Sequence, residues 1–188
     1  MNRNRDRIIG ILFLSAFPLY GIGSSLLESA SSSTELGLVL VLSNSTVVFL
    51  IGRMLQEIVT PLNKVVADAY FYARLSEALI LAFSAILVYN HDDDNDVNAW
   101  YYRVAMIGLG VGSLPLLTVL TRAEQIPKWL GSLGTVGYSC VIGGIIAGSK
   151  GGADQELYMM IPGALFEVTF AIWLIVRGFN FDGYDYVR

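Results

Sequence analysis

The sequence has few of the residues that metal sites and redox sites use. It contains one cysteine, Cys140, and one histidine, His91, in 188 residues. A disulfide within the chain is therefore excluded, as is a tetrahedral cysteine–histidine zinc site built from this chain alone. We expect no metal site and no cofactor.

Charge is also scarce, and positive charge especially so. Charged residues make up 15% of the sequence, whereas soluble domains carry about 25%. The net charge is −4 and no basic patch occurs, so we do not expect a nucleic-acid partner. The acidic segment 91–98 alternates aspartates, but Val97 and Arg103 stand where a calcium loop of the EF-hand type needs glycine and glutamate. We expect a solvated acidic turn there.

Long hydrophobic runs, by contrast, dominate the sequence. Hydrophobic residues account for 54% of the chain and come in blocks of about 20, the length that crosses a hydrocarbon core. The pattern predicts an all-α, polytopic membrane protein: six transmembrane helices in one bundle and a single domain over residues 1–188. The predicted spans are 8–27, 36–55, 64–89, 100–120, 129–148 and 157–176. The first run exceeds the roughly 7–15 residues of a signal-peptide core, so we expect it to be a retained span.

Several residues are expected to interrupt or bound these spans. Pro61 predicts a loop over residues 56–63. Pro18, Pro115 and Pro162 fall inside three spans, where proline kinks or breaks a helix. The aromatic and acidic tail, residues 178–188, is expected to lie on the surface.

Positively charged residues predict the orientation in the membrane. Cytoplasmic loops are enriched in lysine and arginine. In a six-span arrangement, one side of the membrane holds Arg3, Arg5, Arg7, Arg53, Lys64, Arg122, Lys128, Arg177 and Arg188. We therefore predict a multi-pass protein of the bacterial inner membrane with both termini in the cytoplasm.

The third span carries a polar stripe inside an apolar run. Because a helix turns about 100° per residue, one stripe contains Asn63, Tyr70, Arg74, Glu77 and Ser84. Ionisable residues inside a span almost always face a protein interior or a water-filled cavity. We expect this stripe to face the inside of the bundle, with Arg74 and Glu77 paired at i, i+3.

Two further polar residues are predicted to join Arg74 and Glu77. Glu167 lies at the middle of the sixth span with no charge within a turn of it, and Asn44 lies at mid-depth in the second span. The predicted buried polar cluster therefore contains Arg74, Glu77, Glu167, Asn44 and Tyr70. Arg74 would lie between the two glutamates, with Asn44 and Tyr70 completing the hydrogen bonds. Its role is open between a structural clamp for three helices and a site for protons or a polar head group.

The sequence offers no arrangement of residues typical of catalysis. The spans contain no histidine, no paired aspartates and no HExxH motif, and the serines lack a base. We expect no enzyme and no catalytic residues. The leading hypothesis is a membrane protein that acts as a homo-oligomer or as a small subunit of a membrane assembly, with the bilayer and other membrane subunits as partners. The alternative is a small transporter or lipid-binding protein that uses the Arg/Glu cluster.

Three strings resemble a known family. They are YARLSEALILAFSAIL at 72–87, IPKWLGSLG at 126–134 and PGALFEVTFAIWLIVRGF at 162–179. Together they resemble the bacterial membrane family called domain of unknown function 4386. The residues that match its pattern are Arg74, Glu77, Pro127, Trp129, Glu167, Trp173 and Gly178. The family has no assigned activity, so the resemblance implies a fold and a topology and no function.

Overall fold

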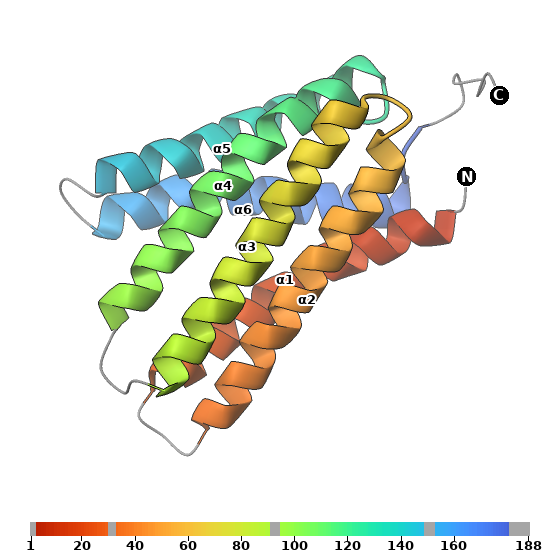
Figure 1. The fold of residues 1–188 in the computed structure, drawn as a ribbon. Helices are drawn as coiled ribbons and strands as arrows, with labels where there is room; N and C mark the ends of the chain where they lie inside the picture. Colours follow the sequence, from red (N-terminus) through yellow and green to blue (C-terminus); the bar gives the residue numbers. More distant parts are fainter. Residues whose placement is uncertain (1–2, 30–32, 91–94, 149–152, 181–188) are drawn as a thin grey trace.

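Six helices form the protein in a computed structural model that describes residues 3–29, 33–90, 95–148 and 153–180 (Figure 1). They are α1 (Arg3–Glu28), α2 (Thr34–Val59), α3 (Lys64–Asn90), α4 (Asn95–Arg122), α5 (Lys128–Gly148) and α6 (Ala153–Val176). These described residues contain no strand, and all six helices are long and apolar enough to cross a membrane, which confirms the predicted fold class. The start of the predicted acidic turn, residues 91–94, lies outside the described residues.

The helices extend beyond most of the predicted spans. α2 continues to Val59, so the predicted loop over 56–63 is wrong and only residues 60–63 connect α2 to α3. Hydropathy detects the apolar part of a helix, whereas backbone hydrogen bonds continue into the polar turns that follow. Thr60 shows this, since its N–H still donates to the carbonyl of Gln56 at 2.8 Å.

The three prolines inside the helices do not break them. Pro18 lies within α1, Pro115 within α4 and Pro162 within α6, and each helix continues on both sides of its proline. The expected break at Pro115 is therefore wrong, and the alternative expectation of a kink at these prolines stays a prediction. Proline removes one backbone hydrogen bond, and in a long apolar helix the remaining bonds and the packing of neighbouring helices maintain the segment.

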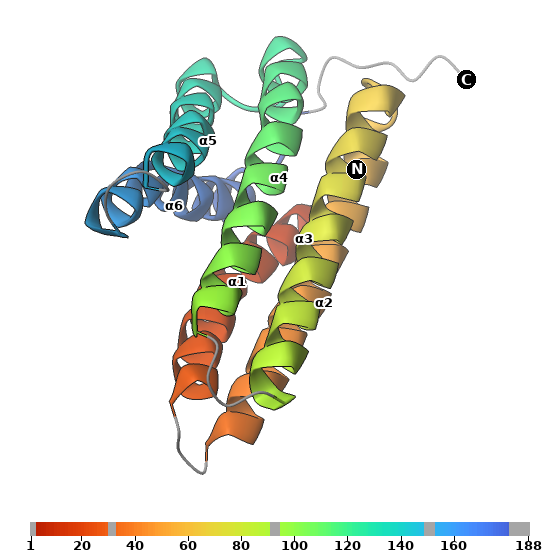
Figure 2. The ribbon, with the colours of Figure 1, turned by 60° about the vertical axis from the view of Figure 1, so that its left-hand side comes forward.

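The helices pack in sequence order into a closed ring. Each helix contacts the next along the chain, and α6 returns to contact α1. Figures 1 and 2 show α2 beside α3 and α5 beside α6 in both views. A glycine allows the closing contact, because a Cβ on Gly10 of α1 would lie 2.5 Å from the carbonyl oxygen of Ala171 in α6.

The end of the ring that carries the chain termini is filled by apolar side chains. All six helices contribute residues with 0% exposure to this basic-end core: Ile9, Leu55, Ala67, Leu120, Leu130 and Leu174. The same end carries eight of the nine basic residues that predict the orientation; the ninth lies outside the described residues. They lie early in α1, α3 and α5, late in α2 and α4, and just after α6. The basic end is therefore polar on its rim and sealed in its centre.

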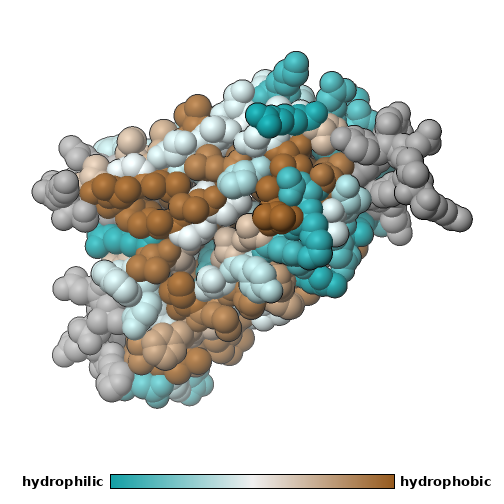
Figure 3. Space-filling view, turned by 45° about the horizontal axis from the view of Figure 1, so that its top comes forward, coloured by the Kyte–Doolittle hydropathy of each residue, from teal (hydrophilic) through white to brown (hydrophobic). Residues whose placement is uncertain are grey.

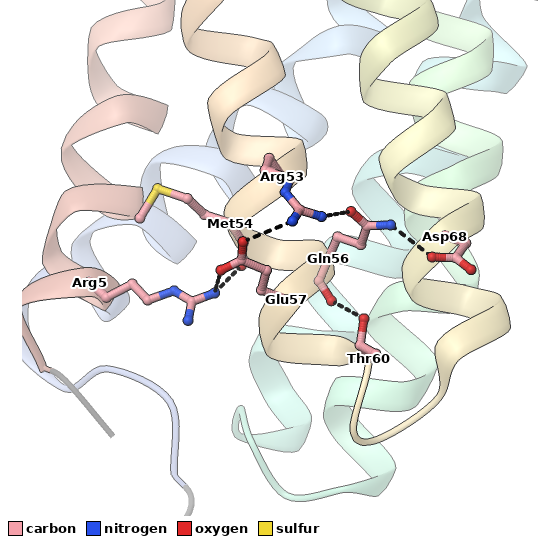
Figure 4. A network of polar contacts seen from close by, with 7 residues as sticks. All are labelled: Arg5, Arg53, Met54, Gln56, Glu57, Thr60 and Asp68. Atoms are coloured by element: carbon pink, nitrogen blue, oxygen red, sulfur yellow. Dashed lines mark hydrogen bonds and ion pairs between the residues drawn. The ribbon is translucent and has the colours of Figure 1, made fainter.

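A polar network joins three helices on that rim (Figure 4). Arg5 of α1 pairs with Glu57 of α2 at 2.9 Å, and Glu57 also pairs with Arg53 at 3.3 Å. Gln56 accepts a hydrogen bond from Arg53 at 2.7 Å and donates one to Asp68 of α3 at 2.7 Å. The network fixes the ends of α1, α2 and α3, although exposed ion pairs contribute little free energy individually.

The chain after α6 folds back onto the first turns of α1. Phe179 N–H donates to Asp6 Oδ2 at 3.1 Å, and the Phe179 side chain is 8% exposed against the ring of Phe170. Gly178 has a φ of +75°, a conformation that suits glycine. The prediction of a surface tail is therefore wrong for Gly178 and Phe179, while residues 181–188 lie outside the described part of the chain.

The outer surface carries the large hydrophobic side chains that a membrane would cover. Figure 3 shows hydrophobic residues over much of the middle of one face and a hydrophilic group toward the end that holds the termini. Exposed examples include Val39 at 57%, Leu79 at 61% and Ile172 at 50%. The chain is thus a multi-pass integral membrane protein.

Candidate functional site

Arg74 and Glu77 form a buried ion pair on the inner face of α3. Arg74 Nη1 lies 2.9 Å from Glu77 Oε2, and the two side chains are 3% and 4% exposed. Their i, i+3 spacing places both on the face that α3 turns toward the ring. A glycine in α2 makes room for the arginine, because a Cβ on Gly52 would lie 2.6 Å from Arg74 Cβ.

Glu167 reaches the same guanidinium from α6. Its Oε1 lies 3.6 Å from Arg74 Nη2 and accepts a hydrogen bond from the hydroxyl of Tyr138 in α5 at 2.8 Å. The Glu167 side chain is 19% exposed, more than those of Arg74 and Glu77. The structure therefore brings α3, α5 and α6 together at one polar point, with Glu167 as its most accessible member.

Aromatic groups hold the other sides of the guanidinium. Arg74 Nε donates to the hydroxyl of Tyr70 at 2.8 Å, one turn earlier on α3. The guanidinium carbon lies 5.2 Å from the ring centre of Phe13 in α1 and 5.5 Å from that of Tyr70, within the range of cation–π attraction. Arg74 is thus held by groups from α1, α3 and α6.

Asn44 is buried close to this site and does not take the predicted role. Its side chain is 2% exposed, yet among the described residues no donor lies within hydrogen-bond distance of its Oδ1. The prediction that Asn44 completes the hydrogen bonds of the cluster is therefore wrong for that oxygen. A buried acceptor without a donor costs free energy unless something else in the site supplies one.

A cavity of about 270 Å³ lies beside these polar residues. Arg74, Glu77, Glu167 and Asn44 all line it, and so do residues from each of the six helices. Its other lining side chains are apolar or aromatic, among them Phe13, Phe17, Tyr20, Tyr102, Met106 and Tyr138. The ring therefore encloses a space with apolar walls and one polar cluster.

The cavity meets the surface between α1 and α6. Phe17 of α1 is 37% exposed, and Gly21 of α1 and Ala164 of α6 are also exposed, although all three line the cavity. Across the ring, Tyr20 of α1 stacks on Tyr102 of α4 with ring centres 5.2 Å apart. The opening is thus on the side of the bundle, where helices as apolar as α1 and α6 face lipid.

The lining residues decide which chemistry the cavity can support. Its ionisable groups are two carboxylates, one guanidinium and three tyrosine hydroxyls, and the described lining contains no serine, threonine, cysteine or histidine. The described residues also contain no group of three or more histidine, cysteine, aspartate or glutamate side chains placed to hold a metal ion. The arrangement suits the binding of a charged or polar group.

Sequence reasoning missed the aromatic part of the site. Tyr138 lies in a glycine-rich helix and Phe13 in an apolar one, so neither interrupts the pattern of its own span. Tyr138 carried one usable signal, because a tyrosine hydroxyl at mid-span requires a hydrogen-bond partner. The polar stripe, in contrast, includes Asn63, which is exposed and uses its side chain to accept from Val66 N–H at the start of α3.

Residues 95–178 match the family described as Domain of unknown function (DUF4386). The match contains the string at 126–134 and all but the last residue of the string at 162–179. The third string, which holds Arg74 and Glu77, precedes the matched residues. The resemblance is confirmed over the matched residues. Searches of the curated proteins and of the solved structures gave no match.

Proposed function

We propose that this integral membrane protein binds a small amphipathic molecule in the cavity, as a lipid-binding protein or a small transporter. The observation that supports the proposal most is the position of the Arg74–Glu77–Glu167 cluster on the wall of a cavity that all six helices build. A purely structural clamp needs no space beside it. Ligand sites commonly combine apolar walls with a few polar groups.

Unsatisfied polar groups also favour binding over a purely structural clamp. Asn44 Oδ1 and Arg74 Nη2 are buried atoms of two residues that line the cavity, and neither has a hydrogen-bond partner among the described residues. A bound polar group supplies what these atoms lack. The proposal includes no reaction, so the expectation that the protein is not an enzyme remains a prediction.

Native mass spectrometry of the protein released from a mild detergent tests the proposal. We expect the unaltered chain to carry an additional small mass. Ala16→Trp should lose that mass, because Ala16 lines the cavity and an indole would fill much of its volume. Leu50→Trp, on the outer face of α2, is the matched control and should keep it. The proposal fails if the unaltered chain carries no additional mass or if Ala16→Trp retains it.

The assembly hypothesis remains a prediction beside this one. The large hydrophobic side chains on the outside of the ring support contact with further membrane subunits or with a second copy, and lipid would cover them equally well. The same mass spectra measure the oligomeric state. A dimer or larger species that survives in both tryptophan variants would support assembly independently of the cavity.

The basic end supports the proposed location. Eight arginine and lysine side chains of the described residues belong to that end, which the positive-inside rule assigns to the cytoplasm. We therefore propose that the protein lies in the bacterial inner membrane with both termini in the cytoplasm.

A further inference from the structure

The charges on the cavity wall do not balance. Glu77 and Glu167 supply two carboxylates and Arg74 supplies one guanidinium, with no other acidic or basic side chain on the described wall. Arg74 contacts both acids, at 2.9 Å and 3.6 Å, so it neutralises one negative charge and is shared by two. When both carboxyls are ionised, the site carries one excess negative charge, which is costly in an apolar surrounding and is relieved either by a proton or by a cation beside it.

The hydrogen-bonding groups indicate a cation that also donates hydrogen bonds. Asn44 Oδ1 lacks a donor, and the carboxylates of Glu77 and Glu167 only accept when ionised. An anion would be repelled by the two carboxylates. It would find one guanidinium nitrogen without a hydrogen bond, Arg74 Nη2. Arg74 Nη2 already approaches Glu167 Oε1 at 3.6 Å, whereas Asn44 Oδ1 and the two carboxylates are acceptors that an N–H donor with positive charge would suit.

The rest of the wall fits an apolar body attached to such a head. Five aromatic side chains line the cavity: Phe13, Phe17, Tyr20, Tyr102 and Tyr138. Aromatic faces attract organic cations and pack against apolar groups. The opening between α1 and α6, at Phe17, Gly21 and Ala164, would admit a molecule that is dissolved in the bilayer.

We propose that the cavity takes a small lipophilic amine in its protonated form, with the ammonium head at Glu167 and Asn44 and the apolar body among the aromatic rings. This inference rests on the proposed function, since it names the class of molecule that the cavity would bind. Glu167 is the principal contact for the head, because it is the more accessible of the two acids and its Oε1 bonds Tyr138 and only approaches Arg74.

Three probes that share a naphthylmethyl body and differ in charge test the inference: 1-naphthylmethylamine, 1-naphthylmethanol and the acetate anion formed by 1-naphthaleneacetic acid. Equilibrium dialysis at neutral pH measures their binding to the full chain in phosphatidylcholine nanodiscs, with empty nanodiscs as the baseline. We expect the amine to bind about tenfold more tightly than the alcohol, and the acetate to bind most weakly. This ranking needs no variant, so it decides the question even if a substituted chain fails to fold.

Two matched variants locate the contact. Glu167→Gln keeps the shape of the side chain and removes its charge, so amine binding should fall to the level of the alcohol. Glu57→Gln makes the same change on the exposed rim of the basic end and should leave all three affinities unchanged. Unchanged amine binding in Glu167→Gln would overturn the inference.

The outcomes separate this inference from the proposed function. Equal binding of the three probes, or tighter binding of the alcohol or the acetate, overturns the preference for an amine and leaves the cavity as a binding site. If none of the three probes binds, the inference is overturned as well. The proposed function is decided separately by the mass spectra: it falls if the unaltered chain carries no additional mass or if Ala16→Trp retains that mass.

Discussion

At the scale of single residues, Arg74 has three partners that share one buried charge. It pairs with Glu77, approaches Glu167 and donates to Tyr70, all inside the ring of helices. Removing one member of a buried ion pair leaves the other without compensation and costs about 3–5 kcal/mol, whereas replacing both members by apolar groups is often close to neutral. The stability that the cluster contributes therefore depends on the balance between its positive and negative charges more than on any one contact.

Arg74→Met tests that balance. We expect the single substitution to lower the free energy of unfolding by about 3 kcal/mol, because two carboxylates then lose their cation. The double substitution Arg74→Met/Glu77→Met should recover part of the loss, since one of those carboxylates is gone. Thermal unfolding of the purified protein in detergent measures both. A double variant less stable than Arg74→Met alone would contradict this account.

The site residues were predictable to different degrees. Arg74 and Glu77 stand out because charges inside an apolar run, spaced by three, lie on one helix face. Tyr138 and Phe13 do not, since their part in the site comes from the helices that happen to lie beside them. Asn44 is identifiable as an inward polar residue, but the lack of a donor for its Oδ1 is a property of the packed ring.

At the scale of helices, the number of elements followed from the apolar runs, and their ends and neighbours did not. α2 passes the residues where hydropathy falls, because Gln56 and Glu57 are held by polar partners on α1 and α3. The contact of α6 with α1 joins residues more than 160 positions apart in the chain, such as Gly10 and Ala171. No periodicity within either helix specifies that partner.

Gly10→Ala tests the contact that closes the ring. The added methyl group would lie 2.5 Å from the Ala171 carbonyl oxygen and 2.7 Å from Ile175 Cγ1, so α1 must move away from α6. Overpacking of this kind costs about 1–3 kcal/mol, and we expect a lower midpoint of thermal unfolding. Gly143→Ala is the matched control, since nothing lies within 4 Å of its added Cβ. Equal midpoints for the two variants would show that the close approach is not required.

At the scale of the whole molecule, the two ends of the ring differ. The basic end is closed by fully buried residues such as Leu55, Leu120 and Leu174. The cavity lies between this core and a small apolar cluster near the other end, formed by Leu27, Val41, Ala85 and Val88. If the basic end faces the cytoplasm, the cavity is sealed from that side, and its opening between α1 and α6 belongs to the middle of the bilayer or to its outer half.

Cysteine labelling in intact cells tests that orientation. In a Cys140→Ser background, which removes the chain's only cysteine, Thr60→Cys reports on the basic end and Glu35→Cys on the opposite end. Both positions are exposed and lie at opposite ends of α2, Glu35 in its first turn and Thr60 just after its last residue. A membrane-impermeant maleimide should label Glu35→Cys and spare Thr60→Cys, because loops rich in arginine and lysine are retained in the cytoplasm. Permeabilised cells are the control and should show both labels. The reverse pattern would place the sealed end outside and the cavity nearer the cytoplasm, so that its ligand would enter from the inner half of the bilayer.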